Sequence, residues 1–86
     1  MDEPTVRKIS LDGSIRYYTN GHLHREDGPA VIRQDGSEFW YRNGMFHRID
    51  GPAITWCDGE KEWFLYGMKL DPILWMIKAH EFENEE

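Results

Sequence analysis

Two consecutive stretches of the chain are copies of one 23-residue unit. Aligning residues 18–40 with residues 41–63 gives 12 identical positions, among them Asn-Gly, His-Arg, Asp-Gly-Pro-Ala, a second Asp-Gly and a closing Trp. A partial copy precedes them, and another follows from Phe64. Self-similarity at a fixed short period is typical of arrays in which each unit buries its apolar face against its neighbour. The sequence therefore predicts a stacked or meandering array with local connections.

Glycine-centred turns divide each unit into short segments. Asn-Gly and Asp-Gly suit two-residue type I′ hairpin turns, because both central residues of such a turn need positive φ. The predicted reversals lie at residues 12–13, 20–21, 35–36, 43–44, 58–59 and 66–67. The segments between them are rich in β-branched and aromatic residues, which favour strands: 30–33, 38–42, 53–56 and 62–66. We expect an antiparallel β-hairpin meander over residues 6–70, in which Pro29 and Pro52 each begin a strand after a bend.

The C-terminal segment follows a different pattern. Asp71-Pro72 fits a helix N-cap followed by proline at the first helical position, and the apolar run after it is unbroken. The pattern predicts a helix over residues 71–82, apolar nearly all round in its first turns, so that one side can dock on the sheet while another meets a partner. Residues 83–86 are expected to be an acidic tail. Residues 1–86 thus read as a single, mainly β domain with one C-terminal α-helix.

Each unit repeats a histidine, an arginine and an aspartate, and this motif raises the question of catalysis. The residues are His24, Arg25 and Asp27, then His47, Arg48 and Asp50. Residues needed in every unit solve a structural problem that every unit shares, whereas an enzyme needs one site. An arginine can pair with the aspartate or stack on a neighbouring aromatic ring. We interpret the motif as a structural brace and the recurring Trp40 and Trp63 as core residues, and we predict no enzymatic activity.

The chain contains no organised motif for metal binding or for nucleophilic catalysis. The residues that could collect a metal are His22, His24, His47, His80 and Cys57. No CxxC or HxxxH pair arranges them, so we predict no metal site and no cofactor. Cys57 adjoins an Asp-Gly turn, where we expect it to be exposed, and no dedicated base accompanies it.

The charge balance restricts the partners. The net charge is -6, with 16 acidic against 10 basic residues, which opposes the neutralisation of phosphates that direct nucleic-acid binding requires. A basic partner is favoured instead. No apolar run approaches the ~20 residues of a membrane span, no leader pattern opens the chain, and one cysteine cannot form an internal disulfide. We therefore expect a cytoplasmic protein with no membrane association.

Residues 40–53 read WYRNGMFHRIDGPA. This stretch resembles a W-Y-x-N-G-x-x-H-R-x-D-G-P-A repeat of small phage and bacterial proteins. It resembles MORN-type repeats more loosely, because their glycine spacing is not reproduced. The resemblance extends over Val6 to Lys69. It implies a β-meander interaction module, encoded by a phage and aimed at a host protein in the host cytoplasm, and it carries no catalytic residues to transfer.

Positions where the two units differ indicate a candidate partner surface. The second unit replaces polar residues with the apolar and aromatic types that interface hot spots favour. The predicted anchors, one of them on the helix, are Trp56, Met45, Phe46, Ile49 and Trp75. The alternative is that these side chains pack under the helix. The carboxylates that could imitate phosphates toward a nucleic-acid-binding partner are Glu60, Glu62, Glu81, Glu83, Glu85 and Glu86.

The favoured function is that of a small, non-enzymatic protein-binding module, a phage-encoded inhibitor of a host defence or nucleic-acid enzyme. Two alternatives stay open. In the first, the protein is a sponge for an anionic nucleotide, which Arg25, Arg42, Arg48 and an aromatic ring clasp. In the second, the exposed edges of the array and the helix drive self-association, and the protein is a structural, homo-oligomerising unit.

Overall fold

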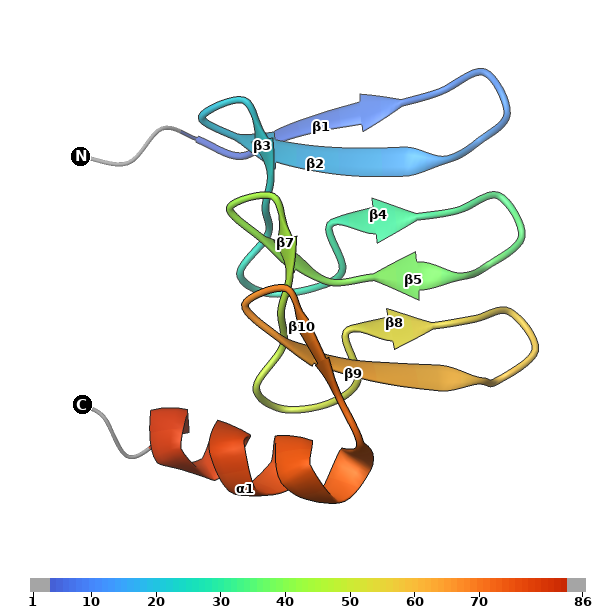
Figure 1. The fold of residues 1–86 in the computed structure, drawn as a ribbon. Coiled ribbons are helices and arrows are strands. Elements are labelled where there is room, and N and C mark those ends of the chain that lie inside the picture. Colours follow the sequence, from blue (N-terminus) through green and yellow to red (C-terminus); the bar gives the residue numbers. More distant parts are fainter. Residues whose placement is uncertain (1–3, 84–86) are drawn as a thin grey trace.

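The computed structural model describes residues 4–83. Over this range antiparallel strands stack in chain order and one helix closes the array (Figure 1). The elements are β1 (Val6–Ile9), β2 (Ile15–Thr19), β3 (His22–Leu23), β4 (Val31–Ile32), β5 (Glu38–Phe39), β6 (Tyr41–Arg42), β7 (Met45–Phe46), β8 (Ile54–Thr55), β9 (Lys61–Leu65), β10 (Met68–Leu70) and α1 (Pro72–Glu83). The mainly β class and the C-terminal helix predicted from the sequence are confirmed.

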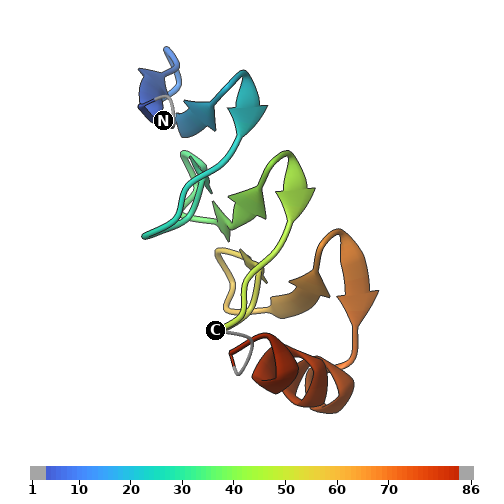
Figure 2. The same ribbon diagram turned by 90° about the vertical axis from the view of Figure 1, so that its left-hand side faces the viewer.

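The main sheet follows the order of the chain, as a meander requires. Its strands lie in the order β1-β2-β4-β5-β8-β9-β10, β3 pairs with β2, and β6 and β7 form a separate two-stranded sheet. One half of β2 pairs with β4 and the other half with β3. In the next unit these two halves are separate strands, β5 and β6, with Trp40 between them. Similar units lie stacked one on another (Figures 1 and 2). The extents of the molecule along its principal axes are 39 × 38 × 17 Å.

The turns fall where they were predicted, but the Asp-Gly turns have another geometry. Asn43 and Gly44 both have positive φ, 51° and 83°, as a type I′ turn requires. At Asp35-Gly36 only the glycine has positive φ, and Arg33 N–H donates to Ser37 O at 2.8 Å. The prediction of a two-residue turn there is wrong: the loop has three residues, with the glycine in the left-handed position. The reason is the aspartate, whose carboxylate accepts the Ser37 N–H at 2.8 Å.

Backbone hydrogen bonds connect each unit to the next. Gly44 N–H donates to Leu23 O and Gly67 N–H donates to Phe46 O, both at 2.8 Å. Trp40 N–H donates to Ala53 O at 2.6 Å, and the Ala53 side chain has 0% exposure. A larger side chain there would separate the strands, so the alanine of each Asp-Gly-Pro-Ala motif is required by close approach.

Aromatic rings make up much of the core between the units. Phe46 stacks on Tyr41 with ring centres 4.5 Å apart, and it lies 4.9 Å from Phe64 of the following unit. These rings pack with Ala53 and Ile54 in one cluster. The core is therefore built between successive units, and no unit buries its apolar residues alone.

Helix α1 closes the array where a third corner would stand. Asp71 occupies the position of the repeated arginine and caps the helix, since its carboxylate accepts the N–H groups of Ile73 at 3.1 Å and Leu74 at 3.0 Å. Trp75 packs on Trp63, with ring centres 4.6 Å apart, and its indole N–H donates to the carbonyl of Arg48 at 2.9 Å. The helix thus serves as the terminal cap that a repeat array requires. Within residues 4–83 no helix has the length and apolar character needed to cross a membrane.

The cap generates a stability prediction. Trp75→Ala removes a buried ring and leaves the Arg48 carbonyl without its donor, so we expect the free energy of unfolding to fall by about 3 kcal/mol. Met76→Ala, one residue further and 59% exposed, should change it by less than about 0.5 kcal/mol. Urea unfolding followed by tryptophan fluorescence and circular dichroism measures both variants. Equal values for the two would contradict the capping role.

Candidate functional sites at the corners and on the helix

Each Asp-Gly-Pro-Ala corner is organised around its arginine. Arg48 Nε donates to Asp50 Oδ1 at 2.8 Å, and Arg48 Nη1 donates to the carbonyl of Pro52 at 3.1 Å. The guanidinium carbon lies 3.8 Å from the centre of the Trp40 ring, which is cation–π contact. One side chain therefore holds the aspartate, the strand that follows the proline and the aromatic ring together.

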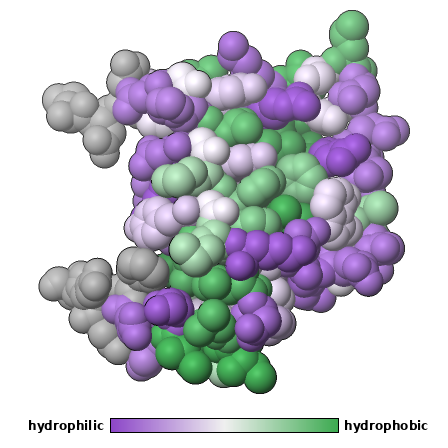
Figure 3. All heavy atoms as spheres, viewed as in Figure 1, coloured by the Kyte–Doolittle hydropathy of each residue, from purple (hydrophilic) through white to green (hydrophobic). Residues whose placement is uncertain are grey.

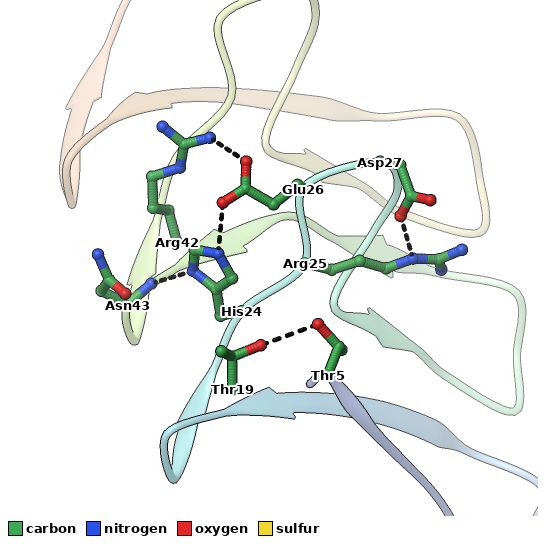
Figure 4. A network of polar contacts seen from close by, with 8 residues as sticks. All are labelled: Thr5, Thr19, His24, Arg25, Glu26, Asp27, Arg42 and Asn43. Carbon is green, nitrogen blue, oxygen red and sulfur yellow. Dashed lines mark hydrogen bonds and ion pairs between the residues drawn. The ribbon is translucent and has the colours of Figure 1, made fainter. Parts of the chain in front are cut away.

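The first corner repeats this arrangement with small differences, and Figure 4 shows its arginine–aspartate pair. Arg25 donates to Asp27 at 3.0 Å and to the carbonyl of Pro29 at 3.2 Å, and its guanidinium lies 4.1 Å from the centre of the Tyr17 ring. The pairing with aspartate and the stacking on an aromatic ring that the sequence predicted are both present. Their recurrence supports a structural role for the motif.

The corners require glycine at Gly28 and Gly51 because the arginine side chain leaves no room for a Cβ there. A Cβ on Gly51 would lie 2.6 Å from the guanidinium carbon of Arg48, and one on Gly28 would lie 2.8 Å from that of Arg25. Neither glycine has a positive φ, in contrast to the turn glycines. The guanidinium therefore lies between the glycine backbone and an aromatic ring.

The histidines have a role that the motif did not reveal. His47 Nδ1 accepts the N–H of Tyr66 at 2.9 Å, and His24 Nδ1 accepts the N–H of Asn43 at 3.0 Å. Each imidazole thus holds the hairpin turn of the next unit. His47 is 6% exposed, and burial lowers its pKa from 6.5 to about 4, with a further contribution from the charge of Arg42. The ring is therefore neutral at pH 7, as an acceptor at Nδ1 must be.

A pocket of about 210 Å³ lies between the two corners. Its lining is Arg25, Glu26, Trp40, Tyr41, Arg42, His47, Arg48, Ile49 and Asp50. Glu26 bridges His24 Nε2 at 2.9 Å and Arg42 at 3.2 Å (Figure 4), and the hydrogen bond from His24 together with the charge of Arg42 lowers the Glu26 pKa. The structure thus brings together the three arginines that the sequence analysis had grouped for an anionic nucleotide. The volume is below the about 300 Å³ at which small-molecule sites usually begin, so a whole nucleotide would not be enclosed.

The predicted partner anchors do not form one surface. Trp75 is 8% exposed and belongs to the helix–sheet core, so its assignment as an anchor is corrected. Phe46 lies half-buried in the aromatic cluster, and Trp56 packs on Phe39 at 5.4 Å and donates its indole N–H to Glu62 at 2.7 Å. Both side chains are partly buried against other aromatic rings and not under the helix, so they form a smaller contact surface than predicted. Met45 and Ile49 remain exposed, at 42% and 36%.

Sequence reasoning placed every anchor except Trp75 in the β-repeat region, whereas four neighbouring exposed apolar residues lie on the helix. The apolar helix face consists of Ile73, Leu74, Met76 and Ile77, which are exposed by 68%, 39%, 59% and 54%. Figure 3 shows the corresponding apolar region over α1. The signal for this face was the apolar character of the first helical turns on all sides, from which the sequence analysis expected one side of the helix to meet a partner. Among the helix side chains that the structure describes, Trp75 and Ala79 are the buried ones.

The predicted acidic surface is divided between separate elements. Glu60 lies at the β8–β9 turn and Glu81 near the end of α1, which Figure 1 shows on opposite sides of the molecule. Glu62 is held by Trp56 and by Lys69 at 3.3 Å, and these contacts, the tryptophan bond above all, lower its pKa. Glu83 is the last residue of α1, and Glu85 and Glu86 lie outside the described residues. The acidic side chains that the structure places thus do not form a single phosphate-like cluster.

No group of three or more metal-ligating side chains occurs among residues 4–83. Cys57 is exposed, as expected from its place beside a turn. Comparison of the chain with protein-family models, with curated proteins and with solved structures gives no match. The arguments for function therefore come from the geometry of the molecule.

The corner brace generates a second prediction. Arg48→Lys keeps the charge but loses the planar fork that reaches Asp50, the Pro52 carbonyl and the Trp40 ring together. We expect the free energy of unfolding to fall by about 2 kcal/mol, measured by urea denaturation. Arg33→Lys, at an exposed turn, is the matched control and should stay within about 0.5 kcal/mol of the parent. Equal losses of unfolding free energy in Arg48→Lys and Arg33→Lys would show that the planar guanidinium of Arg48 contributes nothing beyond its charge.

The buried imidazole generates a pH prediction. The pKa of His47 is about 4 in the folded state against 6.5 ordinarily, so the unfolded chain takes up the proton first as the pH falls. The contribution of this imidazole to the free energy of unfolding is complete above pH 6.5 and is lost as the pH falls toward 4. Between pH 7.5 and pH 5 this loss should be about 1 to 2 kcal/mol.

The matched variants for this pH series are His47→Gln and His22→Gln. His47→Gln removes the buried imidazole, so its free energy of unfolding should vary less with pH than that of the parent. His22→Gln removes an exposed imidazole and should leave the dependence unchanged. If His47→Gln loses as much unfolding free energy on acidification as the parent does, the loss comes from other groups.

Proposed function

We propose that the protein is a binding module that docks on another protein through the apolar helix face. The observation that supports it is the exposure of Ile73, Met76 and Ile77 by more than half on a helix whose opposite side is buried. Folded monomers rarely leave contiguous apolar surface of this kind uncovered unless it meets a partner. Burial on binding stabilises a complex by roughly 25 cal/mol for each Å² of apolar surface.

The helix is held in position before any partner arrives. Trp75 and Ala79 pack on the sheet, and the indole N–H of Trp75 donates to Arg48 O. A docking element held by the scaffold loses little conformational freedom on binding, so more of the contact energy contributes to affinity. The array of repeats is the support, and the helix presents the contact surface.

The charge of the chain favours a basic partner. A net charge of -6 accelerates encounter with a positively charged protein and makes association slower at high salt. Host enzymes that act on nucleic acids have such surfaces. Together with the repeat resemblance, this supports a phage-encoded inhibitor of a host defence or nucleic-acid enzyme.

Self-association is the second candidate function, because one edge of the sheet is open. Within residues 4–83, strand β1 pairs only with β2, and all four of its residues are exposed. Its centre carries Arg7 and Lys8, however, and an antiparallel pair of β1 strands would bring like charges together. A heterologous partner is therefore the better candidate.

Ile77→Glu tests the docking face. A carboxylate in the middle of an apolar contact should weaken partner capture at least tenfold and leave the unfolding curve within about 0.5 kcal/mol of the parent. The measurement is affinity capture from a lysate of the source cells, with quantitative mass spectrometry and light scattering of the purified chain. Met45→Glu makes an equally charged change on the strand surface and should retain capture. Loss of capture with Met45→Glu but not with Ile77→Glu would move the interface to the strands.

A further inference from the structure

We propose that the pocket between the two corners binds a phosphate group, either free or as a monoester. This inference concerns a second site and is independent of docking through the apolar helix face. It deepens the alternative in which the protein takes up an anionic ligand, by naming the part of the ligand that is held. The pocket is larger than a bridging water molecule needs, which is about 15 Å³.

The first argument is an unused donor. The indole Nε1 of Trp40 is buried and has no hydrogen-bond acceptor within the part of the chain that the structure describes. Trp40 lines the pocket, and one face of its ring is covered by Arg48. A buried N–H without an acceptor costs about 1 to 3 kcal/mol, and an acceptor that reaches it from the pocket beside Trp40 would remove that cost.

The second argument is the set of guanidinium groups. Arg25 and Arg48 each use Nε and Nη1 in the corner braces and have no bond through Nη2 to a described residue. Arg42 uses only Nη2, toward Glu26. Several arginine donors beside one another suit an oxyanion, and a tetrahedral phosphate offers more acceptor oxygens than a carboxylate does.

The third argument concerns the acidic residues of the lining. Glu26 is bound by His24 and Arg42, and Asp50 is bound by Arg48, so neither carboxylate is an isolated negative charge. Each of the three arginines has one carboxylate partner, Asp27 for Arg25, Glu26 for Arg42 and Asp50 for Arg48, so an oxyanion would bind through their unused N–H donors. Arg42 also disfavours the charged form of His47, which shows the positive influence that this arginine exerts in the pocket. Ile49 and Tyr41 complete the lining of the pocket.

The indole N–H signal of Trp40 in a ¹H–¹⁵N correlation spectrum reports directly on the site. We expect inorganic phosphate and adenosine monophosphate to move this signal to saturation, with dissociation constants on the order of 1 mM. Adenosine and sodium chloride at matched ionic strength should not move it. No movement with about 20 mM phosphate, or an equal movement with adenosine or salt, would overturn the proposal.

Two variants and a control locate the binding. Arg42→Gln removes a lining charge without touching either brace and should weaken phosphate binding at least about fivefold. Arg33→Gln removes the same charge at a turn outside the lining and should leave it unchanged within about twofold. Ile49→Glu places a carboxylate in the exposed wall and should abolish the shift even if Arg42→Gln folds poorly. Parental binding in folded Ile49→Glu would overturn the assignment to this pocket, whatever happens at the helix.

Discussion

The architecture depends on an arginine held between a glycine and an aromatic ring. At the second corner the guanidinium of Arg48 fills the space above Gly51, stacks on Trp40, and satisfies both Asp50 and the Pro52 carbonyl. A planar cation with several donors performs these tasks together, and lysine could not. Because the brace sets the direction in which the chain leaves the corner, it also sets where the next unit stacks.

The series of corners stops where this device is replaced. The third unit has Asp71 at the arginine position, and the chain turns into a helix instead of a corner. Trp75 then stacks on Trp63, and its indole reaches the Arg48 carbonyl. The cap buries one side of the helix and leaves the other apolar side uncovered, so the end of the array and the proposed docking surface have the same cause.

Stacking also produces contacts that no single unit contains. His24 and His47 each accept a backbone N–H from the turn of the following unit, and Glu26 reaches Arg42 across 16 positions in the chain. The pocket between the corners exists because two successive braces lie beside each other. The interface between units that buries His47 and keeps it neutral therefore also contains the arginines that we propose to hold a phosphate.

The sequence by itself determined what depends on a few neighbouring residues: the period, the turn positions, the type I′ turn at Asn43-Gly44, the arginine–aspartate pairing and the cap at Asp71. These follow from dihedral preferences and short-range hydrogen bonds, which are properties of the residues involved. Only the tertiary structure decided that Trp75 is buried, that Phe46 and Trp56 pack between units, and that Ile73, Met76 and Ile77 are exposed. An apolar side chain is equally suited to a core and to an interface, and its place depends on which surfaces the stacked units present to it.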